Sequence, residues 1–454
     1  MASSSRALSE DALRNILESE DLWESIEDSN QMGSSKKSVS VGVPNREAVL
    51  EELERLSEES DENEEDSEIL SDHNSETEQE DSDSDEKELP IRKSWYGKDN
   101  TKWSKTAGIR GRTPAHNLVT ILPGLIGPAR NNPPREPVYA WSLLIPNEMI
   151  QKLVDFTNLK ITSTRENCKK SKRFAQSQTK FWPSFTENTN ICEIKTFFGL
   201  LNLQSIFKSN HEDVRSIWAT DGTGRPIFRA TMSLARFSFL LSCLRFDNVE
   251  TRKERVKTDK LTAVSELFDE FVARSKSCYS PGIYLTVDEM FVPFRGKCGF
   301  RMNIPNKPAK YGIKVHVLAD AKTHYLVDAK IYAGSEIKVD GAKKPTLSNP
   351  TRVVLRLVEC VKGTNRNITG DNWYSSVELV DELKKNSLTY VGILRKNKKS
   401  VPPEFLPNRF HSSTFEFTSS TTIVSYMPKK SKTVILLSSM HHDNSVNETT
   451  KKRS

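Results

Sequence analysis

The stretch that decides the fold is YLTVDEMFVPFRG, residues 284–296, which follows closely on the breaker pair Pro281-Gly282. Its apolar run is typical of a central β-strand, but two adjacent carboxylates, Asp288 and Glu289, interrupt it. Because side chains alternate across a strand, these two face opposite sides of the sheet. An acid in such a strand needs a cation, a metal ion or a solvent-filled edge. Asp288 is therefore either a structural ion-pair partner or a metal ligand.

Strand and helix signals continue on the C-terminal side of this stretch. Two further strands are predicted at 313–318 and 325–332. After them the sequence predicts a helix at 352–361, a short strand ending near Asp371, a helix opened by a capping box of Ser375 and Glu378, and a strand at 389–394. The order strand, strand, strand, helix, strand, helix, strand predicts the α/β class, with a mixed ribonuclease H-like sheet.

A second candidate acid, Asp371, lies in RNITGDNWYSS, between a predicted strand end and a predicted helix. Open sheets commonly place ligand-binding groups there, although a turn-forming aspartate is the alternative. In the ribonuclease H-like order the first and fourth strands are neighbours, so Asp288 and Asp371 are expected to meet. Their hard oxygen ligands suit Mg²⁺ or Mn²⁺. Two such ions carry out in-line phosphoryl transfer, generally with a third carboxylate.

The segment between the two acids, around the turn that joins the first two strands, is rich in basic and aromatic residues. This combination suits a DNA strand, because lysines and arginines neutralise phosphates and aromatic rings stack on bases. An ordinary solvated basic loop is the alternative. Closeness to the acids favours DNA. The residues predicted to contact it are Arg295, Arg301, Lys307, Lys310 and Lys314.

Composition divides the chain into regions. Residues 1–90 are acidic and serine-rich, and we expect most of them to be disordered, as a solubilising tail. Residues 91–137 read as a basic linker, which either lies along phosphates or merely connects. Apolar residues at helical spacing predict a helical domain over 138–280. The ribonuclease H-like domain is expected over 281–454, with an insertion at 397–440.

Charge and cysteine usage narrow the class of protein. The net charge of +5 is what remains of 66 basic and 61 acidic residues, and the acids concentrate early, so the body is more basic than the whole chain. A basic body favours a polyanionic partner. The 6 cysteines are scattered without metal-ligand spacing, which predicts reduced thiols and no zinc module. No apolar run suits a membrane span or a secretory signal, so we expect an intracellular protein with no membrane partner.

Three stretches of this sequence resemble the piggyBac transposase family: 232–248 (MSLARFSFLLSCLRFDN), 284–321 and 367–383. The resemblance runs from about Val138 to Glu448. It implies a cut-and-paste DNA transposase with three catalytic aspartates on a ribonuclease H-like domain, preceded by a helical domain for dimerisation and DNA binding. The first two aspartates of the family match Asp288 and Asp371, which the resemblance therefore assigns to catalysis and metal binding.

The resemblance also implies partners and conditions. These are double-stranded DNA at transposon ends and TTAA targets, Mg²⁺ or Mn²⁺, a homodimer, a hairpin intermediate at the excised end, and action in the nucleus. The family pattern continues beyond NET (447–449) into a segment with the third aspartate and a zinc module, and no position here matches them. We therefore expect either a transposase chain without competent catalysis, truncated at its C-terminus, or a domesticated, non-catalytic DNA- or chromatin-binding protein.

Overall fold

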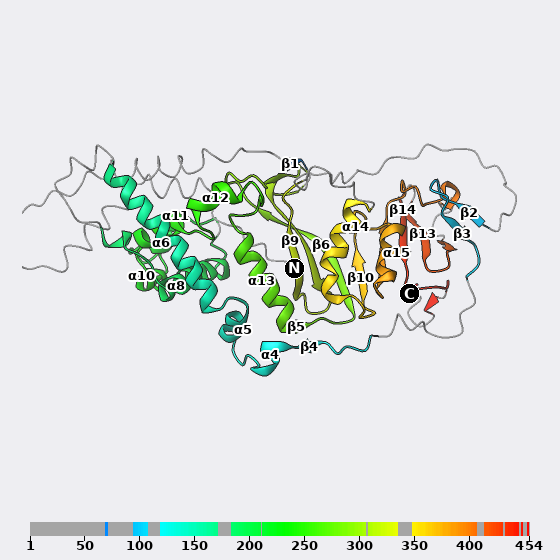
Figure 1. The fold of residues 1–454 in the computed structure, drawn as a ribbon, viewed down its shortest axis with the longest axis horizontal. Coiled ribbons are helices and arrows are strands. Elements are labelled where there is room, and N and C mark those ends of the chain that lie inside the picture. Colours follow the sequence, from blue (N-terminus) through cyan, green and yellow to red (C-terminus); the bar gives the residue numbers. More distant parts are fainter. Residues whose placement is uncertain are drawn as a thin grey trace, which may run out of the picture.

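The computed structural model describes residues 69–70, 94–107, 119–170, 183–209, 211–305, 307–334, 347–405, 413–429, 432–444, 446–447 and 452–453. The acidic run that was expected to be disordered lies almost wholly outside these residues. Helices gather at one end of the described molecule, the main sheet occupies the middle, and short strands gather at the other end (Figure 1).

A helical domain precedes the sheet, as predicted. Its long helix α6 (Asn147–Lys170) packs against α8 (Ile191–Ile206). Ile194, Phe197 and Leu200 are the buried residues of α8, at the spacing of one helical face. The other helices are α4 (Gly127–Asn131), α5 (Pro137–Leu144), α9 (Val214–Trp218), α10 (Pro226–Thr231), α11 (Leu234–Cys243), α12 (Val249–Arg255) and α13 (Ser265–Cys278).

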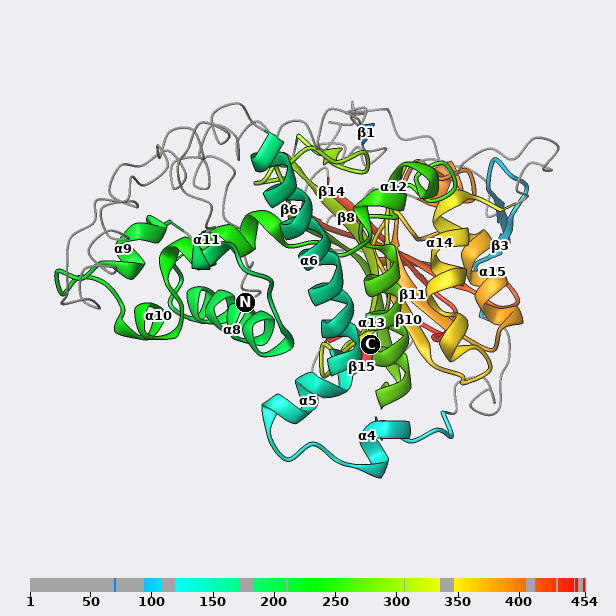
Figure 2. The same cartoon turned by 60° about the vertical axis from the view of Figure 1, so that its left-hand side comes forward.

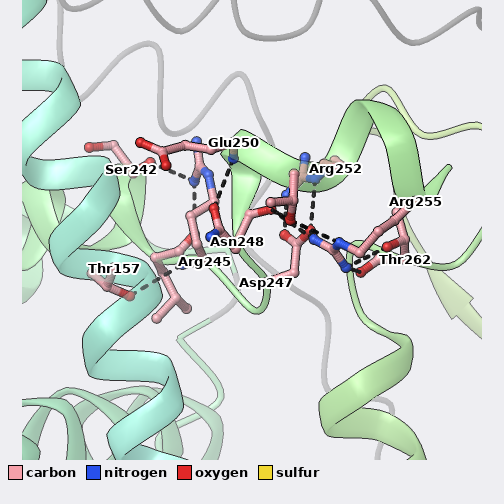
Figure 3. Close-up of polar contacts among 11 residues, drawn as sticks. Thr157, Ser242, Arg245, Asp247, Asn248, Glu250, Arg252, Arg255 and Thr262 are labelled. Atoms are coloured by element: carbon pink, nitrogen blue, oxygen red, sulfur yellow. Dashed lines mark hydrogen bonds and ion pairs between the residues drawn. The ribbon is translucent and has the colours of Figure 1, made fainter.

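A buried polar junction ties α12 to the segment that enters α13 (Figure 3). The carboxylate of Asp247, which is only 1% exposed, accepts hydrogen bonds from the guanidinium groups of Arg252 and Arg255. Arg255 also donates to the backbone oxygens of Asn248, at 2.7 Å, and Thr262, at 3.2 Å. One carboxylate thus fixes the path of the chain between the helical domain and the sheet.

The main sheet is built around β6 (Tyr284–Pro293). This strand pairs antiparallel with β8 (Tyr311–Asp320), which in turn pairs antiparallel with β9 (Leu326–Ile331). On its other side β6 is parallel to β10 (Asn367–Gly370), and β10 is parallel to β11 (Thr389–Leu394). This is the predicted ribonuclease H-like order, in which the first and fourth strands are neighbours.

Helices cover both faces of this sheet (Figure 2). On one face α13 lies against β9, and its Val272 packs in a cluster with Val315 and Ala329. On the other face α14 (Asn349–Leu357) and α15 (Val377–Lys385) cover the central strands. A short 3₁₀ helix follows α14 at Glu359–Val361. Alternate residues of β6 and β8 therefore enter two different cores.

The N-cap of α15 differs from the predicted capping box. Ser376, not Ser375, is the cap residue, and its side chain accepts from the backbone N–H of Leu379 at 3.1 Å. Glu378 does not reach back to its own helix start. Its carboxylate instead accepts from the hydroxyls of Ser348 and Thr351, both at 2.6 Å, at the start of α14. Ser376 thus caps the helix locally, while a tertiary contact with α14 takes the carboxylate that the capping box would have used.

Beyond β11 the sheet continues into strands of the predicted insertion. Their order is β14 (Lys432–Ser438), β13 (Thr422–Lys429) and β12 (Ser413–Phe417), all antiparallel. A hairpin of β3 (Lys102–Ser104) and β2 (Ser94–Tyr96) completes this edge. The short elements elsewhere are β1 (Ile69–Leu70), β4 (Gly124–Leu125), β5 (Tyr279–Ser280), β7 (Met302–Asn303), β15 (Val446–Asn447), β16 (Lys452–Arg453) and the 3₁₀ turns Ser184–Thr186 and Pro403–Phe405.

The β2–β3 hairpin was not expected, because it falls within 91–137, which was predicted to be a linker. Trp103 has no exposed surface, and its indole N–H donates to the backbone oxygen of Ser400 at 2.8 Å. Each strand has 3 residues, too few to show the alternation that announces a strand. Burial of this tryptophan, rather than strand length, fixes the hairpin on the insertion.

Candidate metal-binding site

The pairing of β6 with β10 brings the two predicted acids to one level of the sheet. Val287 lies opposite Gly370 in the parallel register. Asp288 and Asp371 are the next residues along each chain, so both follow the same rung of the ladder on neighbouring strands. The parallel pairing of β6 and β10 therefore places the two acids on neighbouring strands at the same level of the sheet.

The two carboxylates also interact electrostatically. The Asp288 side chain is exposed at this point of β6, but partial desolvation of its carboxylate raises its pKa, and the negative charges of Asp371 and Glu289 push the pKa in the same direction. The backbone N–H of Glu289 donates to Asp288 Oδ1 at 2.7 Å, and that of Trp373 donates to Asp371 Oδ1 at 3.0 Å. Each acid is thus oriented by the backbone next to it, and the pair carries a surplus of negative charge.

This donor set fits a divalent cation. Both ligands offer carboxylate oxygen, the donor that Mg²⁺ and Mn²⁺ prefer, and a cation would relieve the charge that raises the pKa of Asp288. Within the part of the chain that the structure describes, no group of three or more His, Cys, Asp or Glu side chains has a metal-binding arrangement. Asp288 and Asp371 are thus the two carboxylates here that could hold such a cation, while the carboxylate of the neighbouring Glu289 is paired with Lys314.

The predicted DNA-contacting residues on the β6–β8 connection differ in exposure. Arg295 and Lys310 are exposed. Arg301 is partly buried, its guanidinium donates to the backbone oxygens of Arg295 and Gly296, and it lies 5.2 Å from the centre of the Tyr311 ring. Arg301 therefore shapes the turn, while Arg295 and Lys310 offer charge to solvent.

Lys307 connects this basic turn to the acids. Its Nζ lies 3.3 Å from Glu289 Oε1, and its charge lowers the pKa of Asp288, although burial and the neighbouring acids prevail. The side chain of Lys307 remains 40% exposed, so it is open to a phosphate as well. The basic turn therefore extends to within reach of the acid pair.

The comparisons with known proteins agree with this geometry. The model of a family described as transposase IS4 matches residues 136–454. A solved structure, the cryo-EM structure of a piggyBac transposase synaptic complex with hairpin DNA, aligns with a TM-score of 0.64 and 34% sequence identity over 73% of this chain. The chain belongs to the piggyBac-type transposase family. It spans 66% of the length of that relative.

Lys314 of this piggyBac-type chain was predicted to contact DNA. The structure corrects this prediction, because Lys314 is only 4% exposed. Its Nζ lies 2.8 Å from Glu289 Oε2. Burial lowers the pKa of Lys314, and Glu289 opposes that shift. Lys314 lies within β8, between Glu289 and the Trp373 ring, rather than on the basic turn, so it presents almost no surface to a phosphate.

The structure of this piggyBac-type chain also shows functional candidates that the sequence interpretation missed. His316 Nδ1 and the Tyr374 hydroxyl are 2.7 Å apart and share a buried hydrogen bond. The ring of Trp373 stacks on His316 with centroids 5.5 Å apart, and Lys314 Nζ lies 4.9 Å from the centre of the Trp373 ring. One signal was available: Lys314 and His316 alternate with valines in a strand that is otherwise apolar.

Two further observations concern the cysteines and the helices of this piggyBac-type chain. Among the residues described, Cys192, Cys243, Cys278, Cys298 and Cys360 are free thiols. None of the described helices is both long and apolar enough to cross a membrane.

Proposed function

We propose that this chain acts on DNA by metal-assisted phosphoryl transfer, with Asp288 and Asp371 as metal ligands and catalytic residues. The observation that carries the proposal is the parallel β6–β10 register, which leaves the two acids on one rung with coupled charges. Mg²⁺ or Mn²⁺ bound there would activate the attacking oxygen and stabilise the leaving oxygen. The chain's own contribution is to hold the two carboxylates in place.

DNA is the proposed substrate because the basic turn leads to the acids. Arg295 and Lys310 present charge to solvent, and Lys307 extends that charge to Glu289, next to Asp288. A phosphate backbone on this turn would bring a phosphodiester to the acid pair. The similar piggyBac transposase was solved in a synaptic complex with hairpin DNA, which supports DNA as the ligand of this chain. TTAA targets, a homodimer and action in the nucleus are proposed from the family likeness.

The extent of catalysis depends on the number of carboxylates. Two-metal sites generally use more than two, and the described residues group no third one with Asp288 and Asp371. We therefore expect the chain to bind DNA and metal but to cleave DNA weakly. A non-catalytic DNA- or chromatin-binding protein is the second candidate, favoured by this same two-ligand set.

Strand nicking tests the proposal and separates the two candidates. Supercoiled DNA with TTAA sites would be incubated with the chain and Mn²⁺, and nicking compared between wild type, Asp288→Ala and Asp371→Ala. We expect weak nicking that depends on Mn²⁺ and falls to background in both variants, because each removes one of two metal ligands. Asp381→Ala, an exposed aspartate on α15, is the matched control.

Each outcome has a distinct meaning. Nicking that survives in Asp288→Ala would show that the acid pair is not the catalytic centre. Salt-sensitive DNA binding by the wild type, with no Mn²⁺-dependent nicking at all, would establish the non-catalytic candidate instead.

A further inference from the structure

We infer that Glu289, Lys314, His316, Trp373 and Tyr374 form a positioning unit, the β8 clamp, that holds Asp371 in place against Asp288. The inference deepens the proposed function, because it takes the two aspartates as the metal ligands. None of the five touches the metal in this scheme. They act through the backbone segments that carry the two acids.

One end of the β8 clamp is attached beside Asp288. Glu289 is the next residue of β6, lies opposite His316 in the antiparallel register, and has a side chain only 10% exposed. Its carboxylate holds the Lys314 ammonium at 2.8 Å. This ion pair joins β6 to β8 in addition to the backbone ladder, and it does so one residue from the first acid.

The other end of the β8 clamp is attached to the loop that carries Asp371. Tyr374, three residues later, hydrogen-bonds to His316 of β8, and Trp373 lies against both His316 and Lys314. Within the loop, the backbone N–H of Trp373 donates to the Asp371 carboxylate at 3.0 Å. The ring contacts of Trp373 thus fix the same residue whose backbone orients the second acid.

The composition of the β8 clamp argues against a purely structural role. Burying a charge and a polar hydroxyl is costly, and apolar residues of similar volume would stabilise a core at least as well. Burial raises the pKa of Tyr374, and the charges of Glu289, Asp371 and Asp288 raise it further. The hydroxyl therefore lies within the electrostatic field of all three carboxylates. Buried polar groups that orient metal ligands have this arrangement.

Binding of Mn²⁺ to the full chain tests the inference without using activity. Free Mn²⁺ would be measured by electron paramagnetic resonance during titration of wild type, Asp288→Ala, Tyr374→Phe and a double variant, Glu289→Gln with Lys314→Met, that keeps the net charge. Partners that orient metal ligands typically account for about 10- to 100-fold in affinity. We expect Tyr374→Phe and the double variant each to weaken Mn²⁺ binding about tenfold or more.

Tyr325→Phe is the matched control. The Tyr325 hydroxyl also makes one partly buried hydrogen bond, to the backbone oxygen of Ser275 at 3.0 Å, but this bond joins α13 to the residue just before β9. Both tyrosine variants should lose similar thermal stability, and only Tyr374→Phe should lose Mn²⁺ affinity. If Tyr374→Phe or the double variant folds and binds Mn²⁺ like the wild type, the β8 clamp has no positioning role. If Asp288→Ala leaves Mn²⁺ binding unchanged, the proposed function itself fails.

Discussion

Glu416 is a buried carboxylic acid far along the sheet from the acid pair. It lies in β12, opposite Ile423 of β13, and has no exposed surface. Burial raises the pKa of Glu416 to about 7, against the opposing effects of the Lys105 ammonium and the Trp95 side chain. Lys105 and Trp95 belong to the β2–β3 hairpin and the residues just after it. The protonation state of Glu416 therefore bears on how firmly this hairpin is held.

Glu416→Gln is expected to stabilise the protein at pH 8 and to change little at pH 5. The pKa of Glu416 is raised from 4.5 in the unfolded state to about 7 in the folded state. Between these two pH values the folded state keeps the Glu416 proton, while the unfolded state releases it. Stability from this group is thus present below pH 4.5 and is lost as the pH rises through 7. At about 1.4 kcal/mol per pKa unit, this rise in pKa lowers the free energy of unfolding by about 3 kcal/mol at high pH. Glutamine does not titrate and avoids this loss.

Urea unfolding at the two pH values measures the effect of Glu416→Gln. Glu404→Gln, at an exposed glutamate of the turn Pro403–Phe405, is the control and should behave like the wild type at both. An equal stability difference between Glu416→Gln and wild type at pH 5 and pH 8 would mean that Glu416 does not titrate in this range.

At the scale of elements, the junction at Asp247 determines how α12 meets α13 (Figure 3). Removing one partner of a buried ion pair typically costs about 3–5 kcal/mol, because the other charge remains without compensation. Arg252 and Arg255 are 23% and 35% exposed, so water can partly solvate them. We therefore expect Asp247→Ala to lower the free energy of unfolding by about 3 kcal/mol, measured by chemical denaturation.

The same helix provides the control for Asp247→Ala. Glu254 pairs with Lys257 at 2.7 Å, and both side chains are mostly exposed. Exposed ion pairs contribute about 0–1 kcal/mol, so Glu254→Ala should be close to wild type. Equal losses in Asp247→Ala and Glu254→Ala would contradict a special role for the buried carboxylate.

Elements with a long, regular pattern were predictable from the sequence, and short ones were not. The strand at 389–394 was predicted at the bounds of β11, because apolar β-formers fill it between polar ends. The 3-residue strands of the β2–β3 hairpin carry no period, and Glu378 of α15 bonds to Ser348 and Thr351, which lie 30 and 27 positions earlier, instead of to its own helix start. Such contacts are set by tertiary packing, which local patterns do not contain.

At the scale of the whole molecule, the order of elements was enough to predict that Asp288 and Asp371 approach each other. Because β10 is parallel to β6, the residues that follow Val287 and Gly370 come to the same level of the sheet, whatever the length of the loops between them. Lys314 fell inside the strand predicted at 313–318, and β8 contains it. It was grouped with the basic turn by its charge, although its place in an alternating strand already indicated an inward-facing side chain.

Salt dependence tests the proposed path of DNA across the molecule. Each lysine or arginine that neutralises a phosphate adds about 0.9 to the slope of log affinity against log salt concentration. Arg295→Gln with Lys310→Gln removes two exposed charges from the basic turn, so the slope should become shallower by about two. The measurement is electrophoretic DNA binding over a series of salt concentrations, independent of metal and cleavage.

Lys384→Gln with Lys385→Gln removes the same net charge from exposed positions at the end of α15. A uniform attraction between a basic body and DNA would lower the affinity equally in both double variants, since only net charge would matter. A path over the basic turn requires the Arg295 and Lys310 variant alone to change the slope. Equal slopes in the two variants would place the DNA elsewhere, and the acids would then need a phosphodiester delivered from another surface.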